Sequence, residues 1–144
     1  MIALDTNLLV YAHREDSPWH EAAFRAVSEV ADGRRAWAVP WPCVHEFLAI
    51  VTHPRIYRPP TPLRLALDQV AAWMESPSLV LLGESEGYWD RARTVLGAGQ
   101  VTGPQVHEAR VAALCLHHGV DELWTVDRDF SRFPGLTVRN PLVR

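Results

Sequence analysis

The sequence contains no lysine: all 14 basic residues of the 144-residue chain are arginine. P-loop nucleotide-binding proteins place a lysine on the phosphates of their ligand. Phosphatases of the haloacid dehalogenase type and response-regulator receivers also need a lysine near an aspartate that ends a strand. The absence of lysine therefore argues against all three classes. The haloacid dehalogenases would in addition need a second aspartate two positions after Asp5, where this chain has Asn7.

Long apolar runs and closely spaced cysteines are also missing. No apolar run approaches the roughly 20 residues that a membrane helix needs, and the N-terminus lacks the basic start and long apolar middle of a signal peptide. We therefore expect a cytoplasmic protein with no membrane contact. Cys43 and Cys115 lack the paired spacing of a zinc site, which predicts two buried free thiols.

The charge balance is slightly acidic, with a net charge of -3 and a pI of ≈ 6.1. Domains that coat nucleic acid electrostatically are usually strongly basic, so any contact with nucleic acid must be local. A content of 48% hydrophobic residues over this length predicts a single domain, residues 1–144, with a proper core.

Strand-like and helix-like segments alternate along the chain. This alternation implies right-handed parallel crossovers, and hence an α/β fold: a three-layer α/β/α sandwich with a mostly parallel sheet of about five strands. One of the predicted helices has Ser17 as its N-cap and ends at Gly33. We expect strands over 2–4, 36–40, 79–82, 122–127 and 136–140, and helices over 8–12, 18–32, 42–53, 63–76, 84–99 and 102–119.

The opening stretch MIALDTNLLVYA turns polar at Asp5, Thr6 and Asn7 between two apolar segments. A strand, a turn and a helix explain this pattern and place Asp5 at the carboxyl end of a strand. Ligands of open α/β sheets bind beyond these ends, so Asp5 is a candidate site residue, with Thr6 and Asn7 orienting it. The alternative is that Asp5 is only a helix N-cap.

Asp127 repeats this arrangement at the end of the apolar segment ELWTVD, with Thr125 as a supporting residue and Asp129 two positions further on. A loop-forming turn is the alternative role for Asp127. For Asp129 the alternative is to cap the short helical turn 130–133.

Two glutamates complete the set of candidate acids. Glu46 and His45 lie on a predicted helix and flank its apolar arc on opposite sides. Periodicity therefore does not tell which of the two faces a site. Glu108 lies in the first turn of a largely apolar helix, where the helix dipole alone would favour a carboxylate. A solvated helix face is the alternative for Glu46.

Strand ends and helix starts should bring Asp5, Glu46, Glu108 and Asp127 to one edge of the sheet. Clustered carboxylates repel one another and resist ionisation unless a cation compensates them. Oxygen ligands without cysteine or histidine suit Mg²⁺ or Mn²⁺. Because Mg²⁺ completes its shell with water and phosphate, the cluster predicts hydrolysis of phosphodiesters.

The chain resembles the PIN-domain ribonucleases, in particular the VapC-type toxins of toxin-antitoxin modules. Four stretches carry this resemblance, and their order and spacing together are specific: LDTNLLVYA, PWPCVHEFLAIVTHPRIY, VHEARVAAL and LWTVDRDFSRFPGL. The resemblance implies a small α/β/α fold, metal-dependent cleavage of RNA, a homodimer, and neutralisation by a cognate antitoxin protein.

The resemblance also implies roles for the acids. Asp5, Glu46 and Asp127 match the first, second and fourth acids of the family, and Asp129 follows as an accessory ligand. The third acid is usually Asp, and Glu108 stands in its place. Because of this departure, a PIN-like binding module without catalysis remains the second hypothesis after a ribonuclease. A metal-dependent phosphatase is the third.

A proline-rich loop follows the Glu46 helix. Its segment HPRIYRPP supplies Arg55, Tyr57 and Arg58, which could hold phosphate and stack on bases. An ordinary solvated loop is the alternative interpretation.

Overall fold

β1 (Ile2–Leu4) is the central strand of a five-stranded parallel sheet with the order β3-β2-β1-β4-β5. The computed structural model describes residues 1–143. Its other strands are β2 (Trp37–Pro40), β3 (Leu79–Leu82), β4 (Glu122–Trp124) and β5 (Val138–Arg139). Its helices are α1 (Thr6–His13), α2 (His20–Asp32), α3 (Trp41–Val51), α4 (Leu63–Met74), α5 (Tyr88–Gly99), α6 (Gln105–His117) and the short 3-10 helix η1 (Arg128–Arg132).

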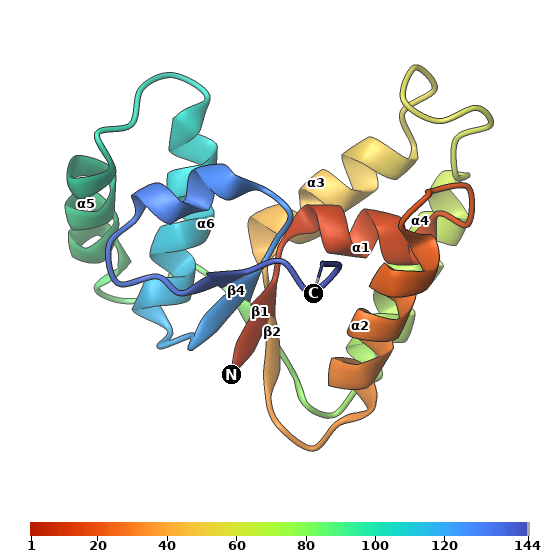
Figure 1. Cartoon of the computed structure of the whole chain (residues 1–144), viewed down its shortest axis with the longest axis horizontal. Coiled ribbons are helices and arrows are strands. Elements are labelled where there is room, and N and C mark those ends of the chain that lie inside the picture. The colour runs from red at the N-terminus through yellow and green to blue at the C-terminus, as the bar shows by residue number, and fades with distance from the viewer. Residues whose placement is uncertain (144) are drawn as a thin grey trace.

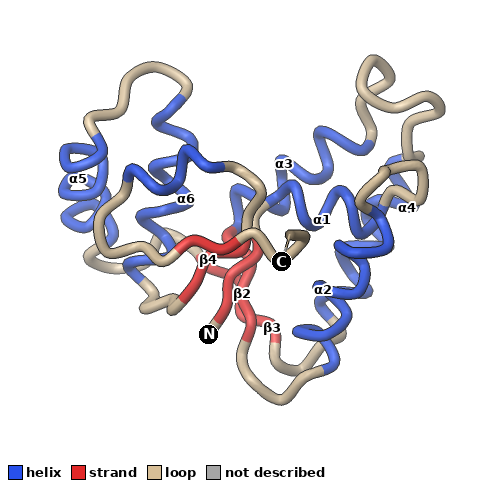
Figure 2. Tube along the Cα trace, viewed as in Figure 1, coloured by secondary structure: helices blue, strands red, loops and turns tan. Residues whose placement is uncertain are grey.

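The helices cover the sheet on both sides (Figures 1 and 2). The chain runs from β1 outward to β2 and β3, then returns to place β4 on the other side of β1. Because parallel crossovers are right-handed, this reversal puts α1 to α4 on one side and α5 and α6 on the other, as Figure 1 shows. The predicted three-layer α/β/α sandwich with five strands is confirmed.

The reversal of strand order lies between β1 and β4. Their register pairs Ile2 with Glu122 and Leu4 with Trp124, and Asp5 N donates to Trp124 O at 3.0 Å. In open α/β sheets the crevice for ligands opens at such a reversal, beyond the carboxyl ends of the two strands. The segments that follow β1 and β4 are therefore the ones placed to form a site.

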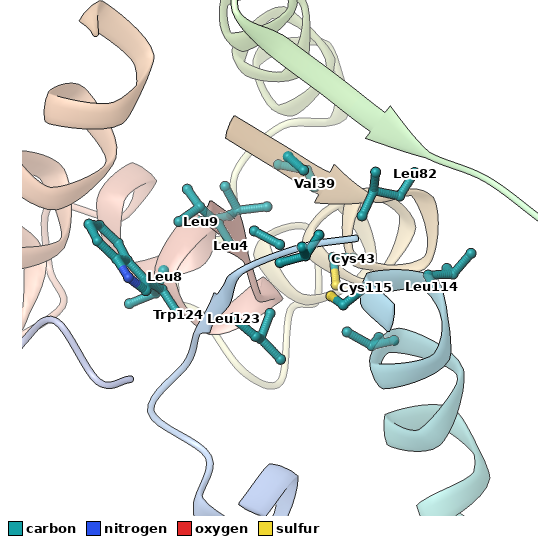
Figure 3. Close-up of a cluster of buried hydrophobic side chains, with 14 of the residues drawn as sticks. Leu4, Leu8, Leu9, Val39, Cys43, Leu82, Leu114, Cys115, Leu123 and Trp124 are labelled. Atoms are coloured by element: carbon teal, nitrogen blue, oxygen red, sulfur yellow. The ribbon is translucent and has the colours of Figure 1, made fainter. Parts of the chain in front are cut away.

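Buried aliphatic side chains fill the spaces between the layers (Figure 3). Small residues of α6, including Ala109 and Ala112, are fully buried and let this helix approach the sheet closely. Cys43 and Cys115 are both free and buried, as predicted. Burial raises the pKa of the Cys115 thiol to about 12, so it stays protonated at neutral pH.

Most element boundaries agree with the predictions within a few residues, and the larger differences have local causes. The Ser17 cap was wrong: Ser17 Oγ accepts from Trp19 N at 3.2 Å, and α2 begins only at His20. α5 begins at Tyr88 and not at residue 84, because Gly87 adopts a left-handed φ of 81° that a helix cannot contain.

Two further expectations are corrected near the C-terminal strands. The cap of η1 is Asp127 and not Asp129, since Asp127 Oδ1 accepts from Asp129 N at 2.9 Å. β4 ends at Trp124, three residues earlier than predicted, where the chain begins to turn toward η1. Within residues 1–143, no helix combines the length and the apolar character required to span a membrane.

Candidate metal centre

Asp5 follows β1 and is the N-cap of α1, a role that leaves its other carboxylate oxygen available to the site. Its Oδ1 accepts a hydrogen bond from Thr6 N at 2.8 Å and a weaker one from Cys43 Sγ at 3.5 Å. The residue is only 7% exposed. This burial raises the pKa of Asp5 above its ordinary value, although hydrogen bonds from Thr125, Thr6 and Cys43 act in the opposite direction.

Thr125 links the ends of β1 and β4. Its hydroxyl donates to Asp5 Oδ2 at 2.7 Å and accepts from Asn7 Nδ2 at 3.1 Å and from Asp127 N at 3.0 Å. A hydroxyl has one proton and two lone pairs, so all its hydrogen-bonding positions are used. Since Thr125 is 1% exposed, water does not compete for these bonds.

Asn7 adds a second connection between the same segments. Its Nδ2 donates to Asp5 Oδ2 at 3.3 Å, and its Oδ1 accepts from Val126 N at 3.4 Å. The amide thus connects the first turn of α1 with the segment that leads from β4 to Asp127. The structure places the three residues predicted to support the site, Thr6, Asn7 and Thr125, in hydrogen-bond contact with predicted acids.

Glu46 approaches the site from α3. Its Oε2 accepts from Thr6 Oγ1 at 3.2 Å. Partial desolvation raises the pKa of Glu46, and the nearby charge of Asp5 raises it further, while the bond from Thr6 lowers it. Both Glu46 and His45 are exposed, but only Glu46 lines the cleft, whereas His45 Nδ1 contacts Trp41 O within the helix.

Glu108 forms a carboxylate cluster with Asp127 and Asp129. One oxygen from each lies within 4.8 Å of the others. Glu108 Oε2 is buried and has no hydrogen-bond partner among the described residues. Desolvation first, and then the charges of Asp127 and Asp129, raise the pKa of Glu108. The charge of Arg132 acts in the opposite direction, but it does not outweigh the desolvation and the two neighbouring carboxylates.

The two groups of acids meet in one cleft of about 300 Å³. Asp5, Glu46, Glu108 and Asp127 all line it, together with Thr6 and Asn7. Asp129 adjoins the cleft through its cluster with Glu108 and Asp127.

Several residues of the cleft were not predicted. His107 lines its edge beside Glu108, and Phe130, Ile50 and Val111 give it an apolar wall. Cys43, whose thiol contacts Asp5, lies three positions before Glu46 on α3. This spacing places both on neighbouring positions of one helix face, a signal that the sequence did contain.

The residues predicted to contact RNA lie outside this cleft. Arg55 and Arg58 are exposed on the loop between α3 and α4. The ring of Tyr57 is covered on one face by the Arg14 guanidinium, whose Cζ lies 4.3 Å from the ring centre. Their proposed role in binding RNA stays a prediction.

A divalent cation fits the observed donors. The cluster of Glu108, Asp127 and Asp129 offers oxygen ligands only, which are typical of Mg²⁺ and Mn²⁺. The unpartnered Glu108 Oε2 is the strongest sign, because a buried carboxylate oxygen without a donor is destabilising. A cation would both partner this oxygen and compensate the repulsion within the cluster.

Comparison with known proteins agrees with this geometry. The family model described as the PIN domain matches residues 2–136. The chain belongs to the PIN-domain family. This PIN domain is 31% identical over 137 residues to Ribonuclease VapC48 of Mycobacterium tuberculosis, covering 95% of this chain and 94% of that protein. It is 32% identical to Ribonuclease VapC43 of the same organism, covering 99% and 96%.

Solved structures share the fold of this PIN domain at lower identity. VapC20 of Mycobacterium tuberculosis, described as a toxin that cleaves the sarcin-ricin loop, matches with a TM-score of 0.67 and 15% identity. The match covers 91% of this chain and 93% of that chain. A toxin-antitoxin complex from Klebsiella pneumoniae matches with a TM-score of 0.62 and 17% identity, covering 98% of each chain.

Proposed function

We propose that this protein is a metal-dependent endoribonuclease that hydrolyses phosphodiester bonds of RNA in the cytoplasm. The observation that carries the proposal is the convergence of Asp5, Glu46, Glu108 and Asp127 on one cleft, where Glu108 Oε2 is buried without a partner. Membership of the PIN-domain family and the ribonuclease relatives support RNA as the substrate class.

Different residues of the cleft have different proposed roles. Glu108, Asp127 and Asp129 would hold Mg²⁺ or Mn²⁺, and Asp5 and Glu46 complete the negative wall of the cleft. When bound, such an ion supplies positive charge that polarises a phosphoryl oxygen and acidifies water. Thr125 and Asn7 hold the Asp5 carboxylate in one orientation, and Thr6 does the same for Glu46. Phe130 and Val111 limit the access of water from the apolar side of the cleft.

Glu108 in place of the usual Asp is compatible with this function. The glutamate is one methylene longer, yet its carboxylate lies within the cluster that Asp127 and Asp129 form. The longer side chain is therefore accommodated in this fold, which supports a ligand role over that of a helix-terminus charge alone.

Cleavage of single-stranded RNA with and without metal tests the proposal. The purified protein should cut RNA in Mg²⁺ or Mn²⁺ and stop cutting in EDTA. Asp127→Asn should abolish cleavage without unfolding the protein, because the amide keeps the shape of the side chain and loses its charge. Asp68→Asn is the matched control, since Asp68 is exposed on α4 and does not line the cleft.

Two outcomes would favour the other hypotheses. Binding of metal and RNA without cleavage would indicate a PIN-like binding module. Hydrolysis of small phosphate monoesters in preference to RNA would indicate a metal-dependent phosphatase, so both substrate types belong in the same experiment.

The biological part of the proposal is that this ribonuclease is a toxin held inactive by a cognate antitoxin protein. It is supported by the VapC names of the relatives and by the structural match to a toxin-antitoxin complex. We further propose that the whole chain, residues 1–144, folds as one domain and forms a homodimer. Expression of the chain alone should arrest growth, Asp127→Asn should relieve the arrest, and light scattering should give the mass of a dimer.

A further inference from the structure

A second cavity of about 720 Å³ lies beside α2, where the first residues of β1 and β2 and the last residues of β4 and β5 line it, outside the metal centre. We call it the arginine pocket because Arg25 of α2, Arg34 and Arg35 of the following loop, and Arg139 of β5 all line it. Four of the chain's 14 arginines thus converge on one cavity. The guanidinium of Arg139 also lies over Trp124, with its Cζ 5.5 Å from the ring centre.

These four guanidinium groups are not held in ion pairs within residues 1–143, although Arg25 also lines an adjoining hollow with Glu21, Glu29 and Asp32. Glu29 is the one acidic residue among the described residues that line the pocket. The charge of Arg35 does act on Asp121, but the Asp121 carboxylate is already paired with the amino group of Met1. The pocket therefore carries an excess of positive charge.

The metal centre has the opposite character. No arginine is found among the described residues that line the cleft, which include four carboxylates, although the charge of Arg132 acts on Glu108 from nearby. A polyanionic substrate gains little affinity there beyond what a metal supplies, so its binding energy must come from basic surface elsewhere. The arginine pocket supplies this surface on the same molecule.

We propose that the arginine pocket binds the phosphate backbone of the RNA substrate at a distance from the scissile bond. The inference rests on the proposed ribonuclease function. It favours RNA over an acidic peptide because a ribonuclease needs basic surface for its polyanionic substrate, and no arginine is found among the described residues that line the cleft. Guanidinium groups suit this role, since they bind phosphate with two parallel hydrogen bonds.

The two sites share no residue among the described residues that line them. We therefore expect a dinucleotide to occupy only one of them, whereas an RNA of about 16 nucleotides, the upper end of ordinary single-strand sites, is long enough to reach both.

The salt dependence of RNA binding tests the pocket. Affinity for single-stranded RNA of about 16 nucleotides is measured over a range of salt in Mg²⁺, with Asp127→Asn present in every protein to prevent cleavage. Arg34→Gln with Arg35→Gln should lower the slope of log affinity against log salt by about 1.4, at about 0.7 for each lost phosphate contact. Arg25→Gln alone, on a different element, should lower it by about 0.7.

The matched control removes two exposed arginines of α5 that do not line the pocket, by Arg91→Gln with Arg93→Gln. This pair should leave the slope unchanged, and thermal melting should show that all variants are folded. An equal fall in slope for the control pair would overturn the proposal, because it would indicate general attraction and not a site.

Two further results would overturn the pocket as an RNA site. One is an unchanged RNA slope in the Arg25, Arg34 and Arg35 variants. The other is a loss of affinity for oligoglutamate with unchanged affinity for RNA, which would assign the pocket to an acidic peptide. Cleavage by the parent protein is measured in parallel. If the parent cuts RNA while the slopes stay the same, the pocket proposal alone fails; if the parent cuts no RNA, the proposed function fails.

Discussion

At the scale of single residues, we expect stability and activity to be sensitive to substitution of Thr125. Its hydroxyl makes one bond as donor, to Asp5, and two as acceptor, from Asn7 and Asp127 N. Thr125→Val keeps the shape and removes all three bonds. We expect a loss of about 1–3 kcal/mol in the free energy of unfolding, since buried polar groups are left without partners, and a large fall in RNA cleavage.

Thr125→Ser is the control for this change, because it keeps the hydroxyl and loses one methyl group. It should cost about 0.8 kcal/mol of stability and retain most of the cleavage activity. Urea denaturation and cleavage at saturating Mg²⁺ measure the two effects. Equal activity of the valine and serine variants would show that the hydroxyl does not position Asp5.

Glu108 is predicted to show opposite effects with and without metal. Glu108→Gln removes a charge that Asp127 and Asp129 repel, so the protein in EDTA should melt at a higher temperature than the parent. The same change should weaken Mn²⁺ binding and lower cleavage by about 100-fold, the order of effect of a misplaced reacting group. Glu108→Asp should retain metal binding. A glutamine variant that binds Mn²⁺ and cuts RNA like the parent would reduce Glu108 to a helix-terminus charge.

At the scale of elements, the end of α5 packs against Phe133, the residue that follows η1. A Cβ at Gly99 would lie 2.6 Å from Cε1 of the buried Phe133, which follows η1. Gly99→Ala should therefore displace Phe133 and η1, at a cost of about 1–3 kcal/mol from overpacking. Because η1 begins beside Asp127 and contains Asp129, metal affinity should fall as well.

Gly97→Ala on the same helix is the matched control for this prediction. Nothing lies within 4 Å of a Cβ at Gly97, so the change should stabilise α5 by about 0.5–1 kcal/mol through its backbone entropy. Thermal melting and Mn²⁺ titration separate the two variants. Equal stability of the two variants would show that Phe133 can move away from the added methyl group without a loss of stability.

Element order was predictable because apolar segments alternate with helical periods, whereas several boundaries depended on backbone geometry. The left-handed Gly87 delays α5, and the turn around Ser17 delays α2, although serine is a favoured N-cap by type. A sequence pattern identifies a residue that can cap or continue a helix. It does not determine which backbone angle the tertiary contacts will select.

At the scale of the whole molecule, the crowded carboxylates should make stability depend on pH. Asp5, Glu46 and Glu108 all have a pKa raised above the ordinary value. Between the unfolded and folded pKa values the native state binds more protons, so stability falls as pH rises through the folded pKa values. In EDTA, the parent and Glu108→Gln should be about equally stable near pH 4, and the variant should be the more stable one near pH 7.

Mg²⁺ should remove most of this difference by compensating the charge of the parent. A cation that binds only the native state at about 100 times its dissociation constant adds about 2.7 kcal/mol. Denaturation curves in EDTA and in Mg²⁺ across this pH range provide the measurement. A parent whose stability in EDTA is independent of pH would contradict repulsion within the cluster.

The gathering of the acids could be predicted because strand ends of a parallel sheet share an edge. Asp5 and Asp127 followed from this rule, and Thr125 and Asn7 lie beside them. The arginine pocket could not be predicted, since Arg25, Arg34 and Arg139 come from separate elements that periodicity does not relate. The sequence also could not predict that Glu108 Oε2 lacks a hydrogen-bond partner, because this depends on the position of α6 relative to η1.

The hydrogen bond from Thr125 to Asp5 joins positions 120 residues apart, and this has a consequence for the synthesis of the protein. A growing chain emerges from its N-terminus, with Asp5 and Glu46 first, and β4 and η1 follow only after residue 121. The cleft therefore cannot assemble during synthesis until these two late elements have emerged from the ribosome.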